Sequence, residues 1–234
     1  MKSAHVGKGN NVDRYDMFPH FENCLNMTLR EWTYWHNVMH RHYTTYLGSK
    51  VLKPPFDWLV MQDIIQETRP PLIIEIGSFE GGFALWMAHL TEAMSLGTRI
   101  VGLDITDRPT KVNHPRITWV IGDATTDQVF RKVEELAENR RGMVIEDSDH
   151  KQHTTRKLLE MYYKFVSPGC YLVVEDTVCE CLSLPPFPGP LPAVRDFIQQ
   201  HGDQFVIDRS REKYILTYNP MGYLLRRPDA QRGE

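Results

Sequence analysis

The 234-residue sequence has no long apolar run. No stretch reaches the ~18 apolar residues that a membrane-spanning helix needs. The polar stretch at residues 1–16 also lacks the apolar centre of a signal peptide. We therefore expect a protein without a membrane span that works in the cytoplasm.

Cysteine is scarce and is not spaced for a metal knuckle. The four cysteines are Cys24, Cys170, Cys179 and Cys181, and no C-x-x-C pair occurs. Cys179 and Cys181 stand too close together for an ordinary disulfide. This spacing predicts reduced thiols, which agrees with a cytoplasmic location.

The chain also lacks an excess of basic residues. It carries 27 Lys and Arg against 30 Asp and Glu, a formal net charge of -3. A protein that binds nucleic acid through the phosphate backbone would present a basic face, so we expect no nucleic acid partner. The length favours one α/β domain at residues 57–234, preceded by a helical extension or lid at residues 1–56.

Short apolar runs alternate with helical patterns along most of the chain, after a first stretch of about 20 residues that we expect to be loosely packed. Strands are predicted at residues 72–76, 99–103, 117–121, 143–145, 171–174, 205–208 and 214–218, the last continuing toward 225. Helices are predicted at 29–45, 57–67, 82–94, 127–139, 154–165 and 193–200. The alternation predicts a mostly parallel seven-stranded sheet with an antiparallel C-terminal hairpin.

A glycine-rich turn follows the first of these strands. It reads Glu75-Ile-Gly77-Ser78-Phe-Glu-Gly81-Gly82, which is neither G-x-G-x-x-G nor a P-loop. Glycine lets the backbone turn tightly and approach a ligand closely. Open α/β sheets bind ligands at the carboxyl ends of their strands, so this turn is a candidate cofactor site.

The same turn resembles the first motif of class I methyltransferases, a family with a Rossmann-like fold. The resemblance implies that the turn holds the methionine end of S-adenosylmethionine. Asp104, at the end of the second strand, would accept hydrogen bonds from the ribose hydroxyls, and Asp123, after the third, would lie near the adenine. The implied cofactor-binding residues are Glu75, Gly77, Ser78, Gly81, Gly82, Asp104 and Asp123.

Acidic residues end the fourth and fifth strands, in Glu146-Asp147-Ser-Asp149-His150 and Glu175-Asp176. Because neighbouring strand ends converge, these carboxylates would repel one another unless a cation neutralised them. Oxygen ligands favour Mg²⁺, with Mn²⁺ or Ca²⁺ as alternatives. We assign Asp147, Glu175 and Asp176 as metal ligands, and Asp149 and Glu146 remain alternatives.

This arrangement suggests a reaction at a hydroxyl group. A bound cation lowers the pKa of a coordinated hydroxyl. His150 stands three residues after Asp147 and is the candidate base that takes the proton. Asp147 and His150 are therefore the predicted catalytic residues.

The acidic motifs together resemble the cephalosporin hydroxylase and rhamnosyl O-methyltransferase family, and are similar to the catalytic domain of macrolide-sugar O-methyltransferases. The likeness covers residues 43–226 and includes Lys53, Pro55 and Asp57. It implies that Asp147 and the pair 175–176 bind Mg²⁺ and that His150 is the general base. The implied activity is methylation of a hydroxyl on a sugar, polyol or phenolic natural product.

Three other functions were weighed against this interpretation. An oxygenase that uses Fe(II) and 2-oxoglutarate usually has two histidines and one carboxylate, and here His150 alone lies among the candidate ligands. A non-catalytic binding protein of the same fold would leave the acidic residues at the ends of the fourth and fifth strands without a role. A nucleic acid methyltransferase is disfavoured because no Asn-Pro-Pro-Tyr-type motif follows the fourth strand.

Two segments outside the acidic motifs carry further expectations. The aromatic helix at 29–45 is expected to pack as a lid, with a homo-oligomer interface as the alternative. The proline-rich loop at 179–192 is expected to select the acceptor, which makes Leu184 and Phe187 candidate pocket residues.

Overall fold

The structure is a computed structural model that describes residues 24–183 and 187–228. The predicted loose segment at residues 1–20 and the candidate pocket residue Leu184 lie outside the described residues. The chain divides into two compact units, Met1–Val38 and Met39–Glu234. The sheet lies entirely in the second unit, and the domain boundary expected after residue 56 stays a prediction.

Seven strands of the described residues form one sheet in the order β5-β4-β3-β6-β7-β9-β8. Their bounds are β3 Leu72–Ile76, β4 Arg99–Asp104, β5 Ile117–Ile121, β6 Met143–Glu146, β7 Tyr171–Val174, β8 Phe205–Ile207 and β9 Tyr223–Arg226. The first five pair in parallel, whereas β9 runs antiparallel to both β7 and β8. The predicted fold class is confirmed.

The order in which strands are added to the sheet reverses between β3 and β6. From β3 the chain moves outward through β4 to β5, and it then returns to place β6 on the other side of β3. Ligands of open α/β sheets bind in the crevice at such a switch point. The residues that follow β3 and β6 are therefore the first place to look for a site.

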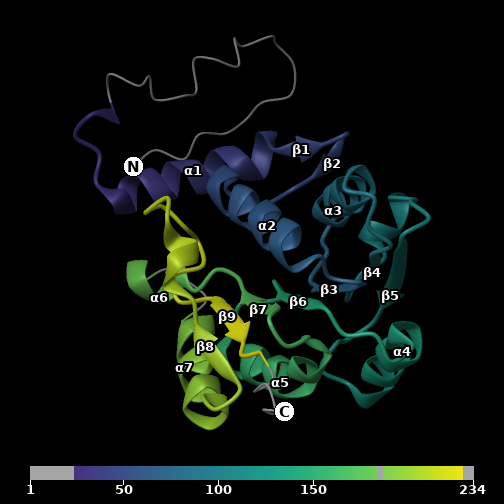
Figure 1. Ribbon diagram of the computed structural model, residues 1–234. Coiled ribbons are helices and arrows are strands. Elements are labelled where there is room, and N and C mark those ends of the chain that lie inside the picture. Colours follow the sequence, from purple (N-terminus) through teal and green to yellow (C-terminus); the bar gives the residue numbers. More distant parts are fainter. Residues whose placement is uncertain (1–23, 184–186, 229–234) are drawn as a thin grey trace. The chain divides into compact units, whose positions relative to one another are not determined.

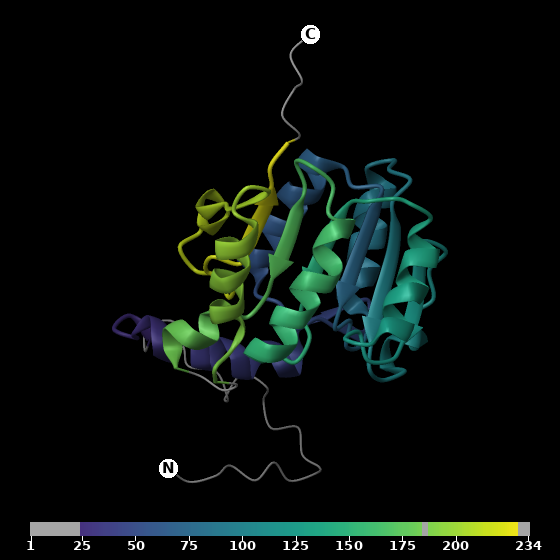
Figure 2. The ribbon, with the colours of Figure 1, turned by 90° about the horizontal axis from the view of Figure 1, so that it is seen from below.

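Helices cover both faces of the sheet (Figure 1). One face carries α2 (Pro55–Thr68) and α3 (Gly82–Ala93), and the other carries α4 (Asp127–Ala137), α5 (Gln152–Tyr162) and α7 (Pro190–His201). Figure 2 shows α5 and α7 side by side across their face. All residues of β3, β6 and β7 are buried, as expected for strands covered on both sides.

The N-terminal part of the described chain begins with α1 (Leu29–Tyr43), which starts in a capping box. The backbone N–H of Thr28 donates to Glu31 Oε2 (2.8 Å), and the Glu31 N–H donates to Thr28 Oγ1 (3.3 Å). A two-stranded hairpin that the sequence analysis missed follows, β1 (Thr45–Tyr46) and β2 (Ser49–Lys50). A further short helix, α6 (Val178–Leu182), was also missed.

The hairpin packs so closely on the start of α3 that there is no room for a side chain at Gly82. A Cβ on Gly82, the first residue of α3, would lie 2.5 Å from the Lys50 carbonyl oxygen. The Tyr46 hydroxyl and His89 Nδ1, from β1 and α3, are 3.0 Å apart. Glycine at position 82 is therefore needed for close packing of the hairpin on the helix.

The strand predicted at residues 214–218 is wrong. Ile215 has a φ of +67° and is 86% exposed, so this segment is a loop. The strand that pairs with β7 and β8 is β9, which begins at Tyr223. Thr217 and Tyr218 instead donate hydrogen bonds to a buried carboxylate of α2, and β9 takes the place beside β7.

That carboxylate belongs to Asp57. Its Oδ1 accepts from the Thr217 hydroxyl (2.6 Å) and the Tyr223 hydroxyl (3.0 Å), and its Oδ2 accepts from the Tyr218 N–H (2.8 Å). Burial raises the pKa of Asp57 to about 6, although the same hydrogen bonds oppose the shift. Asp57 therefore joins the first turn of α2 to the segment before β9.

Within residues 24–183 and 187–228, no helix combines the length and apolar character needed to cross a membrane. The cysteines are free thiols, and Cys170 and Cys179 are buried.

We predict that Asp57→Ala lowers the free energy of unfolding by about 2–4 kcal/mol, because it leaves three donors without a buried acceptor. Urea unfolding measures the change. The control is Asp63→Ala on the same helix, which removes only a partly exposed ion pair with Lys213 and should cost less than about 1 kcal/mol. Equal losses in the two variants would contradict the anchoring role.

Candidate active site

A pocket of about 570 Å³ opens at the carboxyl ends of β3, β4, β5 and β6 and extends along α5. Gly77, Asp104, Asp123 and Asp147, four residues that the sequence analysis selected, line it. Of the other predicted cofactor residues, Glu75, Ser78, Gly81 and Gly82 lie outside its wall. The structure therefore brings together the acids that end successive strands and places part of the glycine turn behind them.

Gly77 is the residue on which the turn after β3 depends. Its φ is +93°, and a Cβ there would lie 1.9 Å from the carbonyl oxygen of Asp147. The Asp147 N–H donates to the Ile76 carbonyl (2.8 Å), and the Gly77 N–H donates to the Leu103 carbonyl (2.8 Å). Only glycine lets the ends of β3, β4 and β6 meet this closely.

Asp104 shapes one wall of the pocket. Its Oδ2 accepts from the Phe79 N–H (2.8 Å), and its Oδ1 accepts from both the N–H and the hydroxyl of Thr106 (2.8 Å each). A carboxylate oxygen can accept more than one hydrogen bond, so Asp104 can fix the loops and still face a ligand.

Asp123 lies at the open edge of the pocket. Its Oδ1 accepts from the N–H (2.8 Å) and hydroxyl (2.7 Å) of Thr125. These hydrogen bonds lower the pKa of Asp123, and the charge of Lys157 on α5 works in the same direction. Asp123 therefore carries a stable negative charge at the pocket rim.

Glu75 is buried at 1% exposure inside β3. Burial raises the pKa of Glu75 to about 7, against the opposing charge of Lys53. Its Oε2 has no hydrogen-bond partner among the described residues. Such a carboxyl group can accept a hydrogen bond from a ligand or from a rearranged side chain.

The remaining glycine-turn residues have structural contacts. Gly81 has a φ of +75° and lies against Trp119, whose ring a Cβ would approach to 3.0 Å. Gly82 is held under the β1–β2 hairpin, and Ser78 is buried. That Ser78, Gly81 and Gly82 help to bind the cofactor therefore stays a prediction.

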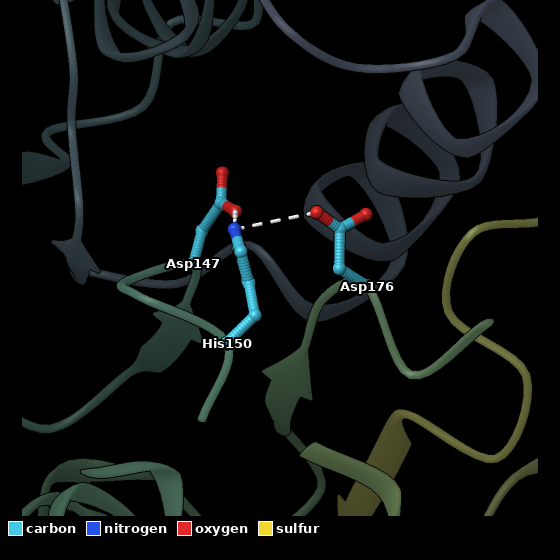
Figure 3. Close-up of side chains that lie close together, drawn as sticks. All are labelled: Asp147, His150 and Asp176. Atoms are coloured by element: carbon cyan, nitrogen blue, oxygen red, sulfur yellow. Dashed lines mark ion pairs between the residues drawn. The ribbon is translucent and has the colours of Figure 1, made fainter. Parts of the chain in front are cut away.

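Beside the pocket, three ionisable side chains converge from the ends of β6 and β7 (Figure 3). His150 Nε2 lies 3.3 Å from Asp176 Oδ2 and 3.8 Å from Asp147 Oδ1. One ligand atom from each of the three residues lies within 4.8 Å of the others. We call Asp147, His150 and Asp176 the acidic cluster.

Two members of the acidic cluster have a left-handed backbone. His150 has a φ of +56° and Asp176 has a φ of +57°. Residues other than glycine pay a conformational cost there, and such residues concentrate at functional sites. The surrounding structure therefore holds both side chains toward one point against a local preference.

Charge and burial compete at His150. Burial lowers its pKa, but the carboxylates of Asp176, Asp147 and Glu146 outweigh burial, so the pKa is raised. Its buried Nδ1 has no partner among the described residues. Nε2 is the ring nitrogen that faces the two aspartates.

Lys53 is the site residue that sequence reasoning missed, because it entered only as part of a family resemblance. Its ammonium group is buried and lies 2.7 Å from Asp147 Oδ2 and 2.5 Å from Glu175 Oε2. Burial lowers the pKa of Lys53, but the carboxylates of Asp147, Glu175 and Glu75 outweigh it and raise the pKa. The available signal was a lysine placed between the apolar pair Val51-Leu52 and the prolines Pro54-Pro55.

Glu175 differs from the other predicted metal ligands in its surroundings. It is buried, and burial together with the charge of Asp147 raises its pKa well above the usual range despite Lys53. One of its oxygens is held by Lys53, and Glu175 is not part of the acidic cluster. Its assignment as a metal ligand stays a prediction. In that role Glu175 would bind the metal through the oxygen that does not contact Lys53.

The two alternative ligands have other partners. The buried Glu146 accepts from the hydroxyls of Ser148 and, at 3.2 Å, of Thr155. Asp149 accepts from the N–H (3.1 Å) and the ammonium (2.9 Å) of Lys151, before α5. Both acids anchor the loop after β6, which leaves Asp147 and Asp176 as the carboxylates that face His150.

The donor set fits a hard divalent cation. Two carboxylates and an imidazole converge, and a third carboxylate, Glu175, lies behind them. The positive charge nearby comes from Lys53 and, when protonated, from His150. Oxygen-rich sites with excess negative charge favour Mg²⁺ or Mn²⁺.

The parallel sheet, its antiparallel end and the pocket at the carboxyl ends of β3 to β6 define a class I methyltransferase fold. Residues 38–227 match the family described as Rhamnosyl O-methyltransferase/CmcI. The chain belongs to this family, which confirms the resemblance seen in the sequence and the expected enzyme class, an O-methyltransferase.

Relatives of known name agree with this assignment. A rhamnosyl O-methyltransferase of Mycobacterium tuberculosis (strain H37Rv) is 28% identical over 191 residues, covering 78% of each chain. The Mycobacterium leprae enzyme of the same name is 29% identical, covering 79% of this chain and 83% of its own.

Solved structures show the same fold. The structure of CmcI with Mg-SAM has a TM-score of 0.63 at 18% identity, covering 95% of this chain and 87% of CmcI. MycE from mycinamycin biosynthesis, in complex with Mg, SAH and mycinamycin VI, has a TM-score of 0.52 at 18% identity. That match covers 77% of this chain and 50% of MycE.

The pKa of Glu75 predicts a pH-dependent stability. The folded protein holds its proton up to about pH 7, whereas the unfolded chain loses it near pH 4.5. The free energy of unfolding therefore falls as pH rises between these values, by up to about 3 kcal/mol. Glu75→Gln has no proton to lose, so its stability relative to wild type should increase from pH 5 to pH 8 in urea unfolding.

The matched control for that comparison is Glu134→Gln, which changes an exposed glutamate on α4. Its stability relative to wild type should be the same at both pH values. A constant difference for Glu75→Gln as well would show that the Glu75 pKa is not raised in the folded protein.

Proposed function

We propose that the protein transfers a methyl group from S-adenosylmethionine to a hydroxyl of a sugar or another small natural product, with Mg²⁺ or Mn²⁺ at the acidic cluster. One observation carries the proposal: Asp147 lines the pocket and is also a member of the acidic cluster. A donor in the pocket and an acceptor at the cluster would therefore meet at Asp147.

The pocket supports binding of the methyl donor. Gly77 offers a backbone that a ligand can approach, and Asp104 is suited to the ribose hydroxyls. Asp123 lies further along the pocket, on the side proposed for the adenine. Glu75 is buried behind the pocket wall, so its expected part in binding the donor stays a prediction.

The metal would be held by Asp147 and Asp176, with Glu175 contributing the oxygen that faces away from Lys53. When bound, the cation lowers the pKa of an acceptor hydroxyl and orients it. His150 would accept the hydroxyl proton at Nε2, and the acceptor oxygen would take the methyl group from the sulfonium of the donor, with S-adenosylhomocysteine as the leaving group. In-line placement by the pocket supplies much of the acceleration.

The relatives support the acceptor class. The mycobacterial enzymes are named for a rhamnosyl acceptor, and the MycE complex contains a macrolide. Phe187, a candidate acceptor-pocket residue, is exposed and does not line the described pocket. Its role in acceptor choice remains a prediction.

Several expectations about the cellular setting also remain predictions. These are the cytoplasmic location, the lack of a nucleic acid partner, the homo-oligomer and the part of natural product biosynthesis in which the enzyme works.

The test is transfer of isotope-labelled methyl from S-adenosylmethionine to rhamnosyl and macrolide-sugar acceptors. We expect activity with Mg²⁺, its loss on chelation and its recovery on adding the metal back. His150→Ala should lower kcat by about 10²–10⁴-fold, because it removes the proposed base. Asp147→Asn should lower kcat at least as much. The control is Asp196→Asn, which changes an acid paired with Arg156 between α5 and α7 and should stay active.

The same protein preparation tests the oxygenase alternative. A thermal shift with S-adenosylhomocysteine but not with 2-oxoglutarate is the expected result. A shift with 2-oxoglutarate alone would contradict the proposed function. Unchanged methyl transfer in both Asp147→Asn and His150→Ala would remove the acidic cluster from the mechanism.

A further inference from the structure

The ammonium of Lys53 joins the ends of two neighbouring strands from outside the sheet. Asp147 follows β6, and Glu175 follows β7, while Lys53 comes from the segment between β2 and α2. Its Nζ contacts one oxygen of each carboxylate, Asp147 Oδ2 and Glu175 Oε2. Lys53 is 3% exposed, so its ammonium is shielded from bulk water.

The segment that delivers Lys53 is fixed at both ends. The Val51 N–H donates to the Thr44 carbonyl (3.1 Å) at the hairpin, and Pro54 and Pro55 lead directly into α2. The ammonium also lies 4.4 Å from the centre of the Phe83 ring on α3. Since proline restricts the backbone and Val51 is itself buried, the ammonium is held in place.

We propose that Lys53 is a positioning residue that holds the rear oxygens of Asp147 and Glu175, so that the second oxygen of each carboxylate faces the cation. This inference rests on the proposed function, because it concerns the metal that Asp147 would bind. Asp147 already shows the expected division, since its Oδ2 lies on Lys53 and its Oδ1 faces His150.

A positioning role and a purely electrostatic role predict opposite effects on metal affinity. A positive charge beside a cation site repels the cation, so removing it would strengthen metal binding if charge alone mattered. Partners that orient metal ligands usually contribute 10–100-fold to metal affinity or activity. Loss of orientation should therefore exceed the gain from reduced repulsion.

The experiment compares Lys53→Met with wild type by Mn²⁺ titration, followed by electron paramagnetic resonance, in the full chain with S-adenosylhomocysteine bound. Methionine keeps much of the packing on Phe83 but removes the cation. We expect Mn²⁺ to bind about 10–100-fold more weakly. We also expect the spectrum of the bound ion to change, because its ligands are no longer held in one arrangement.

The matched control is Lys50→Met, which removes a positive charge three residues away. Lys50 is half-buried and makes no ion pair among the described residues, so Mn²⁺ affinity and spectrum should match wild type. Equal or tighter Mn²⁺ binding by Lys53→Met would overturn the positioning role while leaving the proposed function intact. Absence of Mn²⁺ and Mg²⁺ binding by wild type would instead overturn the metal part of the proposed function.

A second measurement does not depend on folding of the variant. In crystals of the wild-type protein with Mg²⁺ and S-adenosylhomocysteine, the Lys53 ammonium should remain within hydrogen-bond distance of both carboxylates while their other oxygens face the ion. Movement of Lys53 away from either carboxylate in the metal-bound protein would overturn the inference.

Discussion

Two parallel strands that end side by side bring negative charge to one point, and the rest of the site depends on how that charge is balanced. The Glu175 N–H donates to the Glu146 carbonyl (2.9 Å), so the pairing of β6 and β7 continues into the residues that carry the acids. Glu175 is buried, whereas Asp147 and Asp176 are partly exposed, so water screens this charge only in part. Lys53, His150 and a divalent cation are the positive charges suited to balance them.

The reversal of strand order between β3 and β6 places the pocket proposed for the methyl donor beside this charge. Gly77 and Asp147 meet there with no room for a Cβ, so the turn after β3 and the loop after β6 form one rigid junction. Because Asp147 contributes to both the pocket wall and the acidic cluster, donor binding and acceptor activation can share one fixed reference point.

The segment before the sheet is part of this arrangement. The β1–β2 hairpin packs on α3 over Gly82. The next segment places Lys53 against Asp147 and Glu175 and then leads into α2. At the start of α2, Asp57 holds the loop before β9. Residues 44–57 therefore connect α3 and the loop before β9 to the charged centre, and they lie in the same compact unit as the sheet.

Most of the fold and most residues of the candidate site could be read from the sequence. Buried parallel strands appear as apolar runs, and acids at successive strand ends, such as Asp104, Asp123 and Asp147, must converge because parallel strands share one edge. Lys53 could not be placed in this way, because nothing local to an apolar segment says which distant charge it contacts. The tertiary structure decided that contact through burial, which obliges a lysine and a glutamate far apart in the chain to pair.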